Sequence, residues 1–139
     1  MRTMLASAMV ALGLVGTAGA VPRQSIVTIF DGVQFVDSAT PQSVQVAIPT
    51  GKFGGVTLVS QLTDVTNPAL SGLPITCIFT MTETTDPATT LSVAGFSGTI
   101  GRDGYSGGSA AVLAPFLLCR ISVAGNVASR VTVKALFTK

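Results

Sequence analysis

The side chains that could carry out chemistry in this chain are few and widely spaced. The sequence has no histidine, two cysteines and six acidic residues. Without histidine, a serine or cysteine nucleophile lacks its usual general base, and the commonest metal ligand is missing. The acidic pair that lies closest in the sequence, Glu83 and Asp86, falls in TETTDP, which is typical of a solvated turn. We therefore expect a protein that is not an enzyme and that holds no metal or cofactor.

The two cysteines are expected to form a disulfide bond. Cys77 shares one face of an apolar strand pattern with Phe79, and Cys119 shares another with Leu117 and Ile121, so both point toward the core. Core-facing cysteines of an exported protein are usually paired. Closing the loop between them would stabilise the fold by about 4 kcal/mol on the chain-entropy model. The alternative is two buried free thiols that pack as small apolar side chains.

A glycine-rich stretch, GFSGTIGRDGYSGG at residues 95–108, holds the chain's only tyrosine. Glycine recurs at every third position, but the stretch contains no proline, which a collagen helix requires in quantity. We expect a short strand followed by a mobile loop over residues 101–108, shaped by its glycines. If this loop contacts a ligand, the predicted contacts are Arg102, Asp103 and Tyr105.

The composition favours an exported β protein or a subunit that its neighbours cover. Hydrophobic residues make up 47% of the chain and charged residues only 10%, whereas charged residues form about a quarter of an average soluble domain. The basic residues stand singly and the formal net charge is only +2. Because nucleic-acid binding needs several phosphates neutralised together, we expect protein partners and no nucleic acid.

Residues 1–20, MRTMLASAMVALGLVGTAGA, have the parts of a secretion signal. Arg2 precedes an apolar run, and Ala18-Gly19-Ala20 supplies small residues for cleavage before Val21. The run is shorter than the about 20 apolar residues of a transmembrane helix, so we expect no stable membrane anchor after cleavage. The alternative is an uncleaved apolar arm, buried against a partner subunit. Cleavage predicts an extracytoplasmic protein, secreted or periplasmic; an intact N-terminus predicts a virion subunit.

Residues 21–139 read as one all-β domain. Apolar and polar residues alternate over 44–48, 56–63, 75–82 and 130–138, as in strands with one buried and one wet face. Turn signals such as Asp31-Gly32, Asn67-Pro68 and Gly125-Asn126 separate these runs. The pattern predicts a single antiparallel β-sandwich, or jelly-roll-like domain, of about eight or nine strands.

Two runs are apolar on both faces: SIVTIF at residues 25–30 and AAVLAPFLL at residues 110–118. Such a run indicates a strand that is covered on both sides, and in a two-layer sandwich one cover is often another chain. Pro115 inside the second run predicts an edge strand or a bulge. We expect these strands to dock in a homo-oligomer or larger assembly. The candidate docking residues are Ile26, Ile29, Phe30, Val112 and Phe116.

Two stretches resemble small β-sandwich domains of tailed-phage structural proteins. In residues 117–137, LLCRISVAGNVASRVTVKALF, an apolar run with an arginine leads through a glycine-containing turn into a Val-Thr-Val strand. Residues 43–62, SVQVAIPTGKFGGVTLVSQL, are similar to the early strand pair of those domains. The resemblance implies a non-enzymatic role in a large assembly and implies no functional residue. A secretion signal departs from this pattern, because virion proteins assemble in the cytoplasm.

Two functions remain open at this point. The first is a structural or decorating β-sandwich protein that acts by protein–protein contact in a virion or a cell-surface assembly. The alternative is an exported, extracytoplasmic ligand-binding or adhesive module whose ligand is held by loops at one end.

Overall fold

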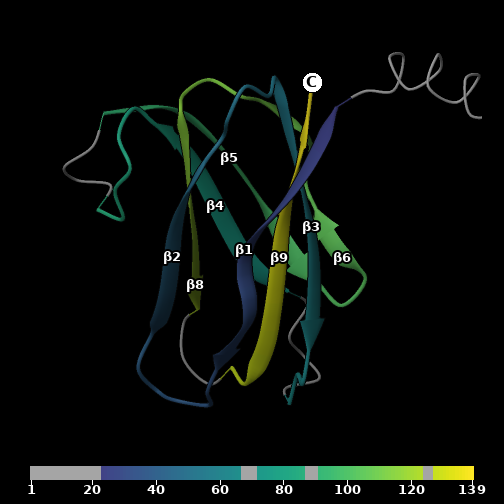
Figure 1. The fold of residues 1–139 in the computed structure, drawn as a ribbon. Coiled ribbons are helices and arrows are strands. Elements are labelled where there is room, and N and C mark those ends of the chain that lie inside the picture. Colours follow the sequence, from purple (N-terminus) through teal and green to yellow (C-terminus); the bar gives the residue numbers. More distant parts are fainter. Residues whose placement is uncertain (1–22, 67–71, 87–90, 124–126) are drawn as a thin grey trace, which may run out of the picture.

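The structure, a computed structural model, describes residues 23–66, 72–86, 91–123 and 127–139. These residues form nine strands and no helix, in two antiparallel sheets that pack face to face (Figure 1). The predicted all-β sandwich is therefore confirmed. The candidate signal in residues 1–20 lies outside the described residues, so its cleavage stays a prediction.

The strands divide between a four-stranded and a five-stranded sheet. In spatial order, the four-stranded sheet contains β1 (Gln24–Phe35), β9 (Ser129–Thr138), β3 (Gly55–Thr63) and β7 (Ala110–Ala111). The five-stranded sheet contains β2 (Gln42–Pro49), β8 (Phe116–Val123), β4 (Leu73–Thr80), β5 (Ser92–Gly101) and β6 (Gly104–Ser106). The edges of the second sheet are therefore β2 and β6.

The strand order is that of a jelly roll. β1 lies beside β9, the last strand, and β2 lies beside β8, the last but one. The chain crosses between the sheets after β1, β2 and β3, stays in one sheet from β4 to β5, and crosses again around β7 and β8. Nested pairing of this kind, with distant strands as neighbours, defines the jelly-roll arrangement. β6 adds a short strand beside β5.

The core lies between the sheets and follows the alternation of the sequence. In β9 every second residue is buried, from Val131 through Val133 and Ala135 to Phe137, while Lys134 faces solvent. β4 behaves in the same way, with every second residue from Leu73 to Phe79 buried. Alternation arises because successive side chains of a strand point to opposite faces of the sheet.

The run at residues 110–118 is not one strand, contrary to the sequence-based expectation. Ala110 and Ala111 form β7 in one sheet, and Phe116 begins β8 in the other. Between them the chain crosses the sandwich, because Pro115 has no N–H group to continue a ladder. The crossing is fixed by Thr50, whose N–H donates to Pro115 O at 2.9 Å and whose hydroxyl donates to Ala114 O at 2.8 Å.

Candidate interaction surfaces

The predicted disulfide is present. Cys77 and Cys119 are directly opposite each other on β4 and β8, with an S–S distance of 2.06 Å and a Cα–Cα distance of 4.1 Å. Both are buried on the core face. The bond joins two neighbouring strands at the centre of the five-stranded sheet, so it anchors β8, which is the only described strand that pairs with β2.

The glycine-rich stretch forms a β-hairpin, so the expected loop over residues 101–108 is wrong in part. β6 pairs with the end of β5, and the turn between them is made by Arg102 and Asp103. Gly104 follows the turn with φ +112°, a conformation that L side chains rarely adopt. Arg102 and Asp103 are exposed at this tip.

Tyr105 turns away from the hairpin tip and packs against the core. Its ring covers Gly98 and Gly107, where an added Cβ would overlap the tyrosine atoms. The phenol oxygen is buried and has no hydrogen-bond partner among the described residues, and burial raises the pKa of Tyr105 above its ordinary value. The structure therefore does not bring Tyr105 onto one surface with Arg102 and Asp103, and their role as ligand contacts stays a prediction.

The apolar run at the start of β1 is explained by a bulge, which corrects the expectation that a second chain covers it. Thr28 pairs with Lys134 and Phe30 with Val133, so Ile29 is an extra residue. A bulge of this kind reverses the alternation of faces. Ile29 and Phe30 therefore both lie in the core of this chain. The candidate docking residue that remains accessible on β1 is Ile26, which is 67% exposed.

Neither candidate docking residue of the second run is fully exposed. Val112 is half-buried in the crossing segment and packs against the core. Phe116 begins β8, half-buried, on the same face of the strand as Leu118, which is itself buried although it points away from the core. Most apolar side chains of this run therefore contact the rest of the chain, although Leu113 is 51% exposed, and a docking role for Val112 and Phe116 stays a prediction.

Three apolar side chains form a patch on the outer face of the four-stranded sheet, which we call the apolar row. Ile26 of β1 lies directly opposite Leu136 of β9. Val59 of β3, which is 55% exposed, lies opposite Lys134 and therefore diagonal to Leu136. Directly opposite side chains contact one another across a sheet, and diagonal ones lie about 7–8 Å apart. Ile26 was predicted from the sequence as a docking residue, whereas Val59 and Leu136 were not. Both occupy solvent-facing positions of alternating strands, which is the sequence feature that could have identified them.

A hollow of about 370 Å³ lies over the outer face of the five-stranded sheet. Its lining residues are Gln45, Pro74, Thr76, Ile78, Leu118, Arg120 and Ser122. Arg120 lies at its centre, in register with Gln45 on one side and Thr76 on the other. No described residue forms an ion pair with Arg120. The hollow therefore combines the apolar side chains of Pro74, Ile78 and Leu118 with one positive charge that has no described ion-pair partner. This combination was not predicted from the sequence.

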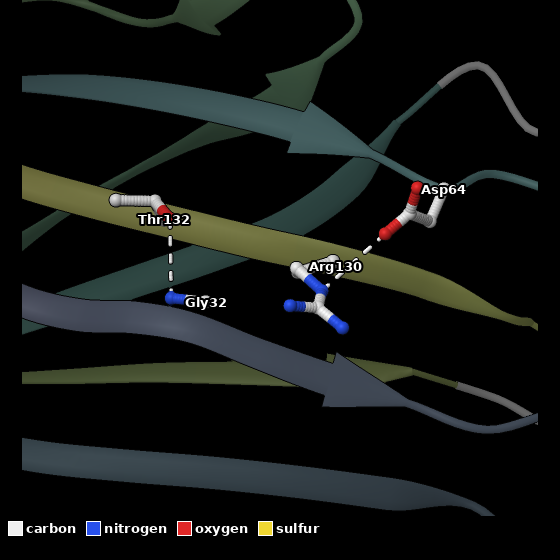
Figure 2. A network of polar contacts seen from close by, with 4 residues as sticks. All are labelled: Gly32, Asp64, Arg130 and Thr132. Carbon is white, nitrogen blue, oxygen red and sulfur yellow. Dashed lines mark hydrogen bonds and ion pairs between the residues drawn. The ribbon is translucent and has the colours of Figure 1, made fainter.

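The free edge of β1 is irregular and is braced from β9. A second register shift lies between Phe30 and Val33, where Gly32 has φ +57°. Figure 2 shows that Gly32 N donates to the hydroxyl of Thr132, at 3.1 Å, and that Arg130 Nε lies 3.3 Å from the Asp64 carboxylate. Bulges interrupt the regular row of backbone groups that an added strand would need.

The free edge of β2 is regular and uncharged. Its sequence, QSVQVAIP, has no charged residue, and it pairs with β8 without a register shift from Gln42 to Pro49. Val44 and Val46 are half-buried and pack against the core. No described strand pairs with the other side of β2.

Two kinds of feature are absent from the described ranges. Those ranges contain no helix with the length and apolar character needed to cross a membrane. They also contain no group of three or more His, Cys, Asp or Glu side chains placed to hold a metal ion.

Comparison with known proteins gives only distant structural likeness. No family model matches the sequence, and no curated protein is significantly similar to it. A protein from Sulfurospirillum deleyianum is similar with a TM-score of 0.46 and 8% identity, over 86% of this chain and 99% of that chain. A structure of infectious bursal disease virus, Gx strain, matches with a TM-score of 0.36 and 14% identity, over 85% and 33% of the two chains. Bacillus endospore appendages, described as disulfide-linked pili, match with a TM-score of 0.32 and 13% identity, over 86% and 88%.

These TM-scores are too low to support an argument about function. A viral structure is among the distant neighbours, whereas the narrower resemblance to tailed-phage proteins stays a prediction.

Proposed function

We propose that this protein is a structural subunit that acts by protein–protein contact in an extracytoplasmic or virion assembly. The observation that carries the proposal is the apolar row. Ile26 and Val59 are more than half exposed on the outer face of a sheet, and Leu136 lies opposite Ile26 and diagonal to Val59. Exposed apolar side chains that form a contiguous patch typically mark a surface that another protein covers.

Two further features support this role. The disulfide between Cys77 and Cys119 suits an oxidising compartment or the surface of a particle. The surface is poor in charge, since only 10% of the chain is charged, so few like-charge contacts oppose close packing of subunits.

Light scattering coupled to size-exclusion chromatography tests the proposal on the full chain, purified from the cells that produce it. We expect a species larger than one chain, or a protein partner that co-purifies. Ile26→Lys and Val59→Lys should each reduce this association, because they place a charge in the apolar row. Val93→Lys is the matched control, since Val93 is similarly exposed (53%) but lies on β5 of the other sheet. A wild-type chain that stays monomeric at high concentration and recovers no partner would refute the proposal.

Sequencing the N-terminus of the same material separates the two locations. A chain that begins at Val21 has been exported, whereas an intact Met1 favours a subunit assembled inside the cell.

The hollow around Arg120 favours a second candidate function, the binding of a small amphipathic carboxylate outside the cytoplasm. The acid would pair with the Arg120 guanidinium, and its apolar part would lie on Ile78 and Leu118. Titration with decanoate, followed by NMR, should shift the signals of these three residues, and Arg120→Gln should abolish the shifts. Lys134→Gln, an exposed charge on the other sheet, is the control. Equal shifts in both variants would exclude the site.

A further inference from the structure

We propose that β2 pairs antiparallel with β2 of a second copy, across a two-fold axis through Gln45, and so joins two five-stranded sheets into one. The inference names a partner for the assembly role proposed above and rests on that role. It uses a different surface, because the apolar row lies on the other sheet.

The direction of the backbone groups of β2 follows from the disulfide. The Cα atoms of Cys77 and Cys119 are 4.1 Å apart, which is the close spacing of a pair that exchanges no backbone hydrogen bonds. The N–H and C=O groups of Cys119 therefore face the other neighbour of β8, which is β2, where Cys119 is opposite Val46. Val46 thus uses its backbone groups within the chain.

A backbone hydrogen bond at the end of β2 fixes the same alternation independently. Thr50 N donates to Pro115 O at 2.9 Å, so the even-numbered residues of this segment direct their backbone N–H and C=O groups toward β8. Odd-numbered residues must then direct their backbone groups toward the free side. The residues that display both an N–H and a C=O group on the free side of β2 are Ser43, Gln45 and Ala47.

Two prolines mark the limits of this free segment. Pro41 and Pro49 are also odd-numbered, so each occupies a free-side position where the missing N–H breaks no hydrogen bond within the chain. Gln45 lies midway between them. The free segment is therefore symmetric about Gln45, with one proline at each end and no donor lost between them.

One register of self-pairing pairs Ser43, Gln45 and Ala47 only with one another. With Gln45 opposite Gln45 of the second copy, Ser43 is opposite Ala47, and Pro41 is opposite Pro49. The pairs at Ser43, Gln45 and Ala47 each exchange two hydrogen bonds. A shift by two residues would place Ala47 opposite Pro41 or Ser43 opposite Pro49, and such a pair exchanges one hydrogen bond in place of two.

The side chains are compatible with this register. No charged residue lies between Pro41 and Pro49, so no like charges meet across the axis. On the core face Val44 of one copy is beside Val46 of the other, and the pairing completes the burial of two half-exposed valines. An uncharged and regular edge left open would otherwise invite non-specific aggregation.

The described part of the segment after β4, residues 81–86, lies beside β2. The Gln45 side chain points away from the core, since its register partner is the exposed Arg120, and it donates to Thr85 O. Glu83, Thr84 and Thr85 line a hollow together with Gln45, Val46 and Ala47, so the second copy must be accommodated beside this segment.

A charge-swap experiment on the full chain tests the register, because Gln45 meets only itself on the two-fold axis. Gln45→Lys and Gln45→Glu should each weaken self-association by about tenfold or more, through like charges placed face to face. An equimolar mixture of the two variants should restore association as a heterodimer. Sedimentation of the single variants and the mixture measures this. A mixture that associates no better than either variant alone overturns the proposed register.

A proline variant tests the backbone pairing without the side chain. Ala47→Pro removes a free-side N–H that makes no bond to β8, so it should leave the thermal unfolding of the monomer unchanged and abolish self-association. Ala47→Ser, which keeps the N–H, is the matched control and should associate normally. Hydrogen exchange should be slow at Ser43, Gln45 and Ala47 in the wild type and fast at Ser43 and Gln45 in Ala47→Pro, which has no amide hydrogen at position 47.

The outcomes separate this inference from the proposed function. If Ala47→Pro associates as the wild type does while Ile26→Lys does not, β2 pairing is wrong and assembly through the apolar row stands. If the wild type remains a monomer and recovers no partner, both fail.

Discussion

The edges β1 and β2 lie side by side in the sandwich, yet they are built in opposite ways. β1 has two bulges, and its extra residue turns a second apolar side chain into the core. β2 has an unbroken register with β8 and displays an uncharged row of backbone groups. Bulges and charges are the usual protection of an edge against strand addition. One edge is therefore closed and the adjacent edge is left open, which is what an edge that receives a partner strand requires.

The largest difference between the edges should appear when a core side chain of each is shortened. Phe30→Ala in β1 should lower the free energy of unfolding by about 3–5 kcal/mol, because a buried phenylalanine leaves a cavity. Val46→Ala in β2 should lower it by less than about 2 kcal/mol, since half-buried Val46 loses two methyl groups worth about 0.8 kcal/mol each when fully buried. Urea unfolding measures both losses of stability, with each substitution made in a variant that does not self-associate, such as Ala47→Pro. Equal losses would contradict the comparison.

The bulge explains why the role of β1 could not be predicted from sequence. SIVTIF reads as apolar on both faces only if alternation continues through Ile29. One extra residue reverses the alternation, and its presence depends on the pairing with β9, a strand about a hundred residues away. Asp31-Gly32 was recognised as a turn signal, but the positive φ of Gly32 serves the second bulge within the strand. Tertiary pairing decides between the two uses of the same dipeptide.

Local patterns did predict what depends on local chemistry. The alternation in β9 and β4 is strict, because one face meets the core and the other meets water, and the pairing of Cys77 with Cys119 follows from their shared inward face. The position of a strand at the edge of a sheet, by contrast, does not follow from a local pattern. Nothing within QSVQVAIP shows that β8 lies on only one side of it, and the symmetry of its prolines gains meaning only once the free side is known.

A smaller effect is expected at the second bulge of β1. Gly32→Ala should lower the free energy of unfolding by about 1–2 kcal/mol, because an L residue at φ +57° is strained. Steric overlap adds little, since the added Cβ would lie 3.9 Å from Arg130 Cδ. Gly32→Asn is the control and should cost less, because asparagine tolerates this conformation. Thermal unfolding measures both, and an alanine variant as stable as the wild type would show that the bulge is not fixed by this residue.

The smallest effect is expected at the ion pair beyond that bulge (Figure 2). Arg130 and Asp64 are 3.3 Å apart, but their side chains are 51% and 71% exposed. An exposed pair of this kind contributes about 0.2–1 kcal/mol, and salt screens it. Asp64→Asn should therefore lower stability by less than about 1 kcal/mol at low salt and by nothing measurable at high salt. Asparagine, like aspartate, tolerates the φ of 55° at this position.

Asp64→Gly separates the charge from the backbone in the same measurement. Glycine also removes the carboxylate but relieves the strain of a positive φ, so it should be at least as stable as Asp64→Asn at every salt concentration. A loss larger than about 1 kcal/mol in Asp64→Asn that persists at high salt exceeds what an exposed ion pair supplies. The contact between β9 and the segment after β3 would then depend on this ion pair, whereas β2 has no charged residue that could form one.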